Sequence, residues 1–345
     1  MAQPPKRPTQ VDVADLAGVS RGTVSLVLNK QDGRVPISEG TRRRVLAAAR
    51  ELGYAPNPVA QMLASGRNRI VGFFTFEETF RYGQEDFHHP YLFGIERRAC
   101  ERDFDLLLFT RGGTGRDRAI YRGGMNSLRL ADGTVFIGTD PDPEGLERLL
   151  GENYPFVLIG RTRIANDRID TVVHDHTRAA IDATTHLLDG CHRRLAFAAD
   201  ALDTEFIRDR LAGAETAVGR MRDATLEVLC GPVVDSAASL ERALRQHGAT
   251  ALICADRRML PAVRGMAAEG RVRVPDDLSV VFLVTDDDDE FFTTASRVRL
   301  DRATLGRIAF DRLIERVEGR AEGFRRILVP CDFVVGGTTR PLARD

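Results

Sequence analysis

The sequence lacks the features that mark membrane-spanning and exported proteins. No stretch approaches the roughly 20 consecutive apolar residues that a membrane-spanning helix needs. The first eight residues carry Lys6 and Arg7 without an apolar segment behind them, so they do not have the form of a signal peptide. We therefore expect a cytoplasmic protein with no membrane partner.

Cysteine is scarce and irregularly placed. The cysteines are odd in number and widely scattered: Cys100, Cys191, Cys230, Cys254 and Cys331. This pattern predicts free thiols in a reducing compartment, and it argues against a disulfide framework or a zinc site. We expect neither a metal nor a cofactor.

Charge is distributed unevenly along the chain. The 345 residues, 43% of them hydrophobic, suffice for two or three domains with a large core. Residues 1–70 contain eleven Lys/Arg and five Asp/Glu, which gives a net charge of +6. The remaining residues contain 38 Lys/Arg and 45 Asp/Glu, which gives a net charge of −7. A basic segment on an acidic body indicates a polyanionic partner for that segment, although an accidental surface bias gives the same numbers.

The basic segment has the pattern of two short helices. Thr9 and Asp12 have the spacing of a capping box, Gly18 predicts the end of the first helix, and Ser20 is a good N-cap for the second. The residues expected to face inward are Val13, Leu16 and Ala17 in the first helix and Val24, Val27 and Leu28 in the second. Two short helices joined by a glycine turn predict a helix-turn-helix, whose second helix can enter the major groove of DNA.

A third helix should complete this all-α headpiece. Ser38 is its predicted N-cap, and Gly53 ends it after Leu52. Val45, Leu46 and Ala49 have the spacing that closes a three-helix core.

From residue 70 onward, short apolar runs alternate with amphipathic segments. The candidate strands are residues 70–76, 104–110, 133–137, 156–159, 171–173, 195–198, 225–230, 251–254 and 278–284. Helical patterns between them include residues 178–188, 206–221, 236–246 and 260–270. This alternation predicts an α/β domain with parallel sheets, and the strands are numerous enough for two doubly wound lobes.

Several stretches resemble the lactose/galactose repressor (LacI–GalR) family. In the headpiece and hinge they are residues 12–20, 23–25, 28–29, 41–45, 52–57 and 59–64, and beyond them 157–161, 186–196, 210–213, 275–281, 329–330 and 339–341. The resemblance implies a sequence-specific DNA-binding transcription regulator, expected to be a repressor. It implies a headpiece at 1–56, a hinge helix and linker at 57–69, and a periplasmic-binding-protein-like effector and dimerisation domain at 70–345.

The resemblance also implies which residues contact double-stranded operator DNA. Arg21 and Gly22 fall on positions that face base edges, and an arginine can donate two hydrogen bonds to guanine. Leu26 stands where a polar residue is common, and a leucine can contact a thymine methyl group. Leu63, in the hinge helix, takes the position of a leucine that wedges into the minor groove. The implied set is Thr9, Ser20, Arg21, Gly22, Thr23, Ser25, Leu26, Asn29, Asn57, Ala60 and Leu63.

These residues have structural alternatives. Ser20, Thr23 and Ser25 can serve as caps and helix surface, and Leu63 can pack between domains. Residues 18–22 also fit the nucleophile-elbow pattern of hydrolases. That pattern requires a strand before its serine, and here a helix precedes Ser20.

The family resemblance places a small-molecule effector, by family a carbohydrate, between the lobes. The implied effector residues are His174, Arg210, Asp256 and Asp286, although Ala255 replaces a usual Asn and residues 281–285 replace a stretch that normally supplies an Asp. The alternatives are an ion pair for Arg210 and a structural role for His174. His174 and His176 also have strand spacing and can share a metal, but no further ligand lies at a suitable spacing.

Two other function classes are alternatives. A solute-binding protein has the same two-lobed fold, but it is exported and has no use for residues 9–64. A sugar-modifying enzyme needs a nucleophile–base or paired-acid arrangement, which the sequence does not offer, so we predict no enzymatic activity. The chain ends at Asp345 without a heptad tail, which favours a homodimer over a tail-mediated tetramer.

Overall fold

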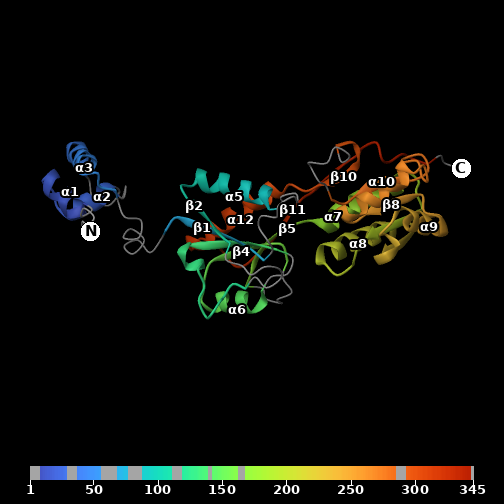
Figure 1. Cartoon of the computed structure of the whole chain (residues 1–345), viewed down its shortest axis with the longest axis horizontal. Helices are drawn as coiled ribbons and strands as arrows, with labels where there is room; N and C mark the ends of the chain where they lie inside the picture. The colour runs from blue at the N-terminus through green and yellow to red at the C-terminus, as the bar shows by residue number, and fades with distance from the viewer. Residues whose placement is uncertain are drawn as a thin grey trace, which may run out of the picture. The chain divides into compact units, whose positions relative to one another are not determined.

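The computed structural model describes residues 8–28, 37–55, 68–76, 88–110, 119–138, 142–161, 168–284 and 293–342. The chain divides into two compact units, Met1–Arg69 and Ile70–Asp345 (Figure 1). No helix in the described part of the chain is long and apolar enough to span a membrane.

The first unit is a three-helix headpiece built from α1 (Gln10–Ala17), α2 (Arg21–Leu28) and α3 (Glu39–Glu51). The predicted capping box is present, since the Thr9 main-chain N–H donates to Asp12 Oδ2 over 2.7 Å. Gly18 ends α1 in the left-handed conformation with φ 64°, which glycine adopts readily. The shared core consists of Val13, Ala14, Ala17, Val24, Val27, Val45, Ala48 and Ala49.

The prediction that Leu16 faces this core is wrong. Leu16 is 48% exposed, and Ala14 is buried in its place. Positions 13, 14 and 17 form one stripe on an α-helix, and this stripe turns position 16 toward solvent. A short side chain at position 14 suits the closest approach of α1 to its neighbours, because α1 packs against both α2 and α3.

The second unit contains two six-stranded sheets. The N-terminal lobe has the order β11-β5-β4-β3-β1-β2, with every neighbouring pair parallel. Its strands are β1 (Ile70–Thr75), β2 (Asp105–Phe109), β3 (Gly133–Ile137), β4 (Phe156–Ile159), β5 (Asp170–His174) and β11 (Arg326–Val329). Side chains alternate between the faces of this sheet. One face packs on α5 (His89–Glu101) and α12 (Arg302–Val317), and the other on α6 (Pro143–Gly151).

The C-terminal lobe has the order β12-β10-β9-β8-β6-β7 and is parallel except for the β10–β12 pair. Its strands are β6 (Arg194–Ala199), β7 (Thr225–Cys230), β8 (Ala251–Cys254), β9 (Ser279–Phe282), β10 (Ser296–Arg299) and β12 (Asp332–Val334). One core layer joins this sheet to α7 (His176–Asp189) and α8 (Glu205–Val218). The opposite layer joins it to α9 (Ala237–His247) and α10 (Leu260–Ala268). The predicted fold class is therefore confirmed.

The chain passes between the lobes three times. It leaves the N-terminal sheet after β5, returns after β10 to add α12 and β11, and crosses back for β12. In the returning segment, α12 packs against β3, β4 and β5 of the N-terminal sheet. Strands β10, β11 and β12 were not predicted.

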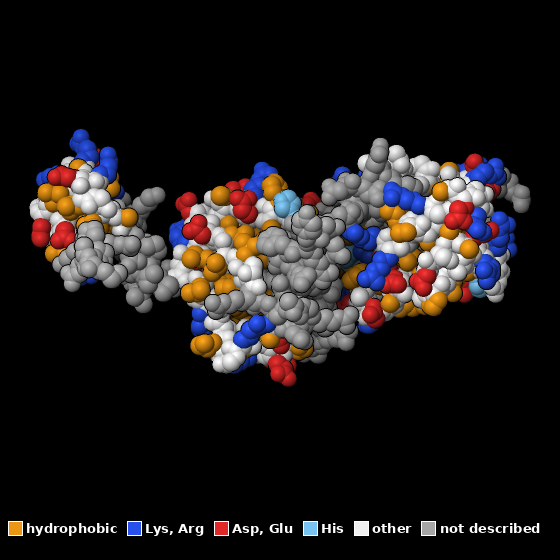
Figure 2. All heavy atoms as spheres, viewed as in Figure 1, with side chains coloured by type: hydrophobic (Ala, Val, Ile, Leu, Met, Phe, Trp, Pro, Cys, Tyr) orange, Lys and Arg blue, Asp and Glu red, His pale blue; other side chains and the backbone are white. Residues whose placement is uncertain are grey.

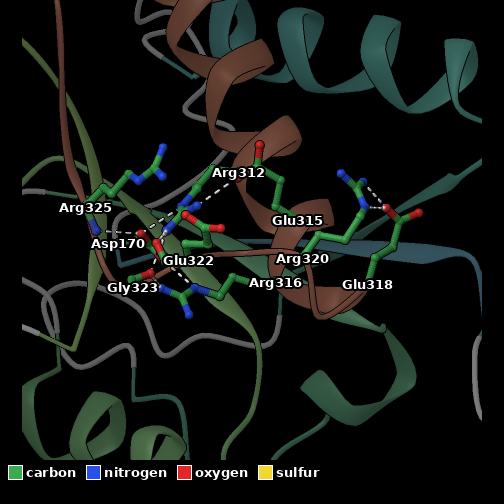
Figure 3. A network of polar contacts seen from close by, with 9 residues as sticks. All are labelled: Asp170, Arg312, Glu315, Arg316, Glu318, Arg320, Glu322, Gly323 and Arg325. Atoms are coloured by element: carbon green, nitrogen blue, oxygen red, sulfur yellow. Dashed lines mark hydrogen bonds and ion pairs between the residues drawn. The ribbon is translucent and has the colours of Figure 1, made fainter.

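A buried ionic network connects α12 and the turn before β11 to β5 of the N-terminal sheet (Figure 3). The Asp170 carboxylate, fully buried at the start of β5, accepts from Arg312 Nε over 2.8 Å and from Arg316 Nε over 2.5 Å. It also accepts from the main-chain N–H of Arg325 over 2.8 Å. Arg312 donates further to the carbonyl of Gly323 over 2.7 Å. One carboxylate thus joins β5, α12 and the turn that precedes β11.

Candidate DNA interface and effector site

Helix α2 begins where the sequence predicted. The Ser20 hydroxyl accepts from the main-chain N–H of Thr23 over 3.1 Å and lies 2.9 Å from the Thr23 hydroxyl. Ser20 follows α1 and its glycine turn, not a strand, so the nucleophile-elbow alternative is excluded by its context. Ser20 is an N-cap.

The outer face of α2 presents the residues implied in base contact. Val24 and Val27 are buried in the headpiece core. Arg21 and Gly22 are exposed, and Thr23, Ser25 and Leu26 are half-buried. A guanidinium at the exposed first residue of this helix has the freedom to reach a guanine edge.

Gly22 is not required by the packing of the headpiece. A Cβ added there would meet only Ser20 Oγ, at an ordinary contact distance of 3.6 Å. Glycine costs up to about 1 kcal/mol relative to alanine inside a helix. The headpiece therefore gives no reason of its own for glycine at this position.

Basic side chains also gather over α3, where Figure 2 shows them on the headpiece surface. Arg43 and Arg44 are exposed, and the half-buried Arg42 lies 3.6 Å from the exposed Glu39 in an ion pair. These arginines contribute much of the positive charge of the headpiece. The implied DNA contacts Asn29, Asn57, Ala60 and Leu63 lie outside the described residues, as does the implied effector residue Asp286.

In the second unit, four side chains meet at the junction of the two lobes. We call them the Arg210 cluster: His174, His176, Phe206 and Arg210. His174 ends β5 of the N-terminal sheet, His176 begins α7, and the other two lie one turn apart on α8. Ligands of parallel α/β sheets bind beyond the carboxyl ends of the strands, which is where His174 lies.

Arg210 is the buried centre of the cluster. Its side chain donates to the carbonyl of Ala255, just after β8, over 2.5 Å and to His176 Nδ1 over 3.3 Å. Its guanidinium carbon lies 5.2 Å from the centre of the Phe206 ring. Burial lowers the pKa of Arg210 to about 10, because removing a cation from water disfavours the charged form.

The two histidines lie side by side, with ring centres 5.8 Å apart. His174 is 5% exposed, and its buried Nε2 has no hydrogen-bond partner in the part of the chain that the structure describes. Burial lowers the pKa of His174 to about 4, and burial followed by the nearby Arg210 charge lowers that of His176 well below its ordinary value. Both rings are therefore neutral near pH 7.

Asp256 is placed near this cluster but its carboxylate already has partners. It follows β8 and caps a short 3-10 helix, Arg257–Met259. Its oxygens accept from the main-chain N–H of Arg258 over 2.8 Å and that of Asp200 over 3.2 Å. It acts on Arg210 through its charge, which opposes the effect of burial on the Arg210 pKa.

An ion pair joins the two lobes beside the cluster. Arg161, just after β4, lies 2.6 Å from Asp209 and 3.8 Å from Glu205, both on α8. Asp209 precedes Arg210 in the chain. This pair connects the helix that carries Arg210 to the carboxyl end of a strand in the N-terminal lobe.

Two members of the cluster, His176 and Phe206, are not among the predicted effector residues. The sequence suggests His176 only as a metal ligand shared with His174. The sequence held a signal for Phe206, since positions 206 and 210 lie on the same face of a helix. The role of His176 depends on the contact between α7 and α8, which the sequence does not reveal.

Acid should weaken the second unit through His174. Its pKa is about 4 in the folded protein against an ordinary 6.5, so the unfolded chain binds the proton first as the pH falls. The neutral, buried His174 ring therefore contributes to the free energy of unfolding above pH 6.5. This contribution is lost progressively as the pH falls toward 4, where the total loss is about 3 kcal/mol. Urea unfolding of the wild type and His174→Gln at pH 7.5 and pH 5 measures it. The variant should lose less stability between the two pH values, and equal losses would contradict this account.

Comparison with known proteins agrees with this architecture. Residues 9–57 match the model for bacterial regulatory proteins of the lacI family, and residues 184–339 match that for a periplasmic binding protein-like domain. The transcriptional regulator CelR of Thermobifida fusca is 34% identical over 285 residues, 80% of this chain and 82% of CelR. The transcriptional repressor PurR of Photobacterium profundum is 27% identical over 341 residues, 96% of this chain and 98% of PurR.

Solved structures give the same result. A lac repressor dimer bound to operator and the anti-inducer ONPF superposes with a TM-score of 0.70 at 25% identity, covering 97% of this chain and 100% of that one. A CelR–cellobiose complex superposes with a TM-score of 0.62 at 26% identity, covering 96% of this chain and 100% of that one. The protein is thus a DNA-binding transcription regulator with a helix-turn-helix headpiece and a periplasmic-binding-protein-like α/β domain. It belongs to the LacI family of bacterial regulatory proteins.

Proposed function

We propose that this regulator is a repressor that binds a near-palindromic operator as a homodimer and responds to a small carbohydrate-class effector at the Arg210 cluster. The proposed effector site rests on the buried Arg210 guanidinium, whose Nε has no hydrogen-bond partner among the described residues. Both lobes contribute residues around it. Unpartnered buried donors are rare in proteins. The relative CelR, solved with cellobiose, supports the choice of a carbohydrate.

We propose that residues 1–56 read the operator, residues 57–69 form the hinge, and residues 70–345 bind the effector and the second subunit. One headpiece offers little contact surface, and two half-sites on a dimer supply the affinity of a specific complex. A short hinge helix is marginal alone. Its folding on DNA, with Leu63 as a minor-groove wedge, then links operator affinity to the spacing of the two subunits.

The test of effector control begins with DNA selected by the protein from a random pool, followed by a metabolite panel screened for release of that DNA. Arg210→Met should still bind the selected operator but lose the response to the releasing compound, because the guanidinium proposed to bind ligand oxygens is removed. Arg220→Met is the matched control, since Arg220 is exposed just beyond the end of α8. An unchanged response of Arg210→Met would place the effector elsewhere.

Arg21→Ala tests base recognition. The variant should lose about 1–3 kcal/mol on the preferred base at one position in each half-site and discriminate less at that position. Arg43→Ala on α3 serves as the comparison, since a phosphate contact affects all sequences alike. Quantitative binding to operators substituted one base pair at a time distinguishes the two. A uniform loss for Arg21→Ala would make it a phosphate contact.

A further inference from the structure

Helix α2 carries a leucine that the headpiece core does not use. Leu26 is half-buried, but within the described headpiece it is neither in the buried core nor among the half-buried apolar side chains packed on that core. Its neighbours on α2 differ, since Val24 and Val27 are buried in the core and Leu28 packs against it. A single surface leucine is ordinary in itself, but this one lies on the helix that enters the major groove in a helix-turn-helix.

The surface beside Leu26 is open because of Gly22. The two residues lie four positions apart, on the same face of α2. A leucine in a helix extends toward the N-terminus, over the residues three and four positions before it, so Leu26 extends toward Gly22. A Cβ added at Gly22 would meet only Ser20 Oγ, at 3.6 Å, so the Leu26 side chain does not come within 4 Å of that point. We call this open space over Gly22, bordered by Leu26, the α2 notch.

The α2 notch has the chemistry to bind a methyl group. The side chain of Leu26 cannot hydrogen-bond to any base edge, and Gly22 has no side chain that could. The apolar group that base edges present in the major groove is the C5 methyl of thymine, beside polar donors and acceptors. Glycine also lets the helix backbone approach the bases closely.

We propose that the α2 notch reads the 5-methyl group of a pyrimidine, so that operator binding depends on a thymine methyl and extends to 5-methylcytosine. This inference rests on the proposed reading of the operator by residues 1–56, and it specifies the chemistry read at one base pair of each half-site. Arg21 and Leu26 lie five residues apart, about 7.5 Å along the helix and about two base pairs of DNA. The methyl group should therefore lie about two base pairs from the guanine that Arg21 contacts.

A comparison of thymine with uracil isolates this contact. The two bases have the same O4 acceptor, so a side chain that hydrogen-bonds to O4 does not distinguish them. Loss of one buried methyl group should weaken binding about fourfold in one half-site and about 15-fold in both. Cytosine lacks the methyl group as well, and 5-methylcytosine restores it beside a different polar edge.

The full-length protein is first used to select operator DNA from a random pool. Each thymine of the selected operator is then replaced by 2′-deoxyuridine in both half-sites, and Kd is measured at one salt concentration. At the position that responds, cytosine and 5-methylcytosine, each paired with guanine, form a second arm. The proteins are wild type, Leu26→Ala, Gly22→Leu and a control, Leu16→Ala, which removes a leucine that is 48% exposed on α1.

We expect one thymine position, about two base pairs from the guanine identified with Arg21→Ala, at which uracil weakens wild-type binding about 15-fold. There 5-methylcytosine should bind more tightly than cytosine by a similar factor. Leu26→Ala should bind the thymine and uracil operators alike, as should Gly22→Leu, whose added side chain occupies the notch. Leu16→Ala should keep the wild-type ratio. Each ratio compares two DNAs on the same protein, so partial loss of folded protein does not change it.

The proposal is overturned if uracil replaces every thymine without loss in the wild type, or if the thymine preference is unchanged in Leu26→Ala. Arg21→Ala, measured on the same operators, separates this proposal from the proposed function. If Arg21→Ala relaxes specificity at one position while thymine and uracil bind alike, α2 reads the operator but the notch does not read a methyl group. A chain that selects no DNA from the random pool would reject the operator reading itself, and the notch with it.

Discussion

Asp170→Asn should lower the free energy of unfolding of the effector domain by about 3–5 kcal/mol, the cost of removing one partner of a buried ion pair. Asp170 is fully buried, and Arg312 beside it is only 3% exposed. An asparagine oxygen can still accept one hydrogen bond, but two arginines lose the charge of their buried carboxylate partner, and Arg312 keeps only the half-exposed Glu315, 2.7 Å away. The loss should be concentrated in the N-terminal lobe, because the network joins β5 to α12 and the turn before β11 (Figure 3).

Urea unfolding of the full-length protein measures this effect, with Asp332→Asn as the matched control. Asp332 pairs with Arg299 over 2.8 Å, but both side chains are more than half exposed, and exposed pairs contribute about 0–1 kcal/mol. Replacing Arg312 with Met in the Asp170→Asn background should recover part of the loss, since it removes one of the two cations that have lost their buried carboxylate partner. Similar small losses in Asp170→Asn and Asp332→Asn would show that the network contributes little.

The headpiece could be predicted in detail because its signals are local. Caps at Thr9, Ser20 and Ser38 mark three helix starts, and each makes its hydrogen bond within three residues. The error at Leu16 has a different origin. Residues 14 and 16 are both apolar and close in sequence, and only the packing of α1 against α2 and α3 decides which is buried.

The last two strands of the C-terminal sheet, β10 and β12, could not be predicted from periodicity. β10 has arginine at two of its four positions and β12 is three residues long, so neither has the apolar run that marks a buried strand. Their conformation depends on pairing with each other and with β9. That pairing depends on the return of the chain from the other lobe.

The prediction of Arg210 as an effector residue comes from the resemblance, within the stretch 210–213. The structure supplies a physical reason for the glycine in that stretch. Gly213 lies one turn after Arg210, where α8 crosses α7. A Cβ there would stand 2.3 Å from the carbonyl oxygen of Thr177 and 2.8 Å from Ala180 Cβ. Glycine at this position allows the two helices to approach as closely as they do.

Gly213→Ala should therefore destabilise the effector domain and weaken its response to effector together. Alanine favours a helix by up to about 1 kcal/mol over glycine, but the clash is with main-chain atoms that cannot rotate away. The helices must separate, at a net cost of about 1–3 kcal/mol. Thr177 is adjacent to His176, so the separation also stretches the 3.3 Å contact between His176 and Arg210.

Gly151→Ala is the matched control, because Gly151 ends α6 and a Cβ there meets nothing within 4 Å. This control should be neutral or slightly stabilising, since it keeps the helix-propensity gain without the clash. Urea unfolding and effector-dependent operator release are measured for both variants. If Gly213→Ala were as stable as Gly151→Ala, the α7–α8 contact would be looser than the structure indicates. If Gly213→Ala lost stability but kept a full effector response, the pocket would not depend on the spacing of these two helices, and Arg210 and His176 would not act as a pair.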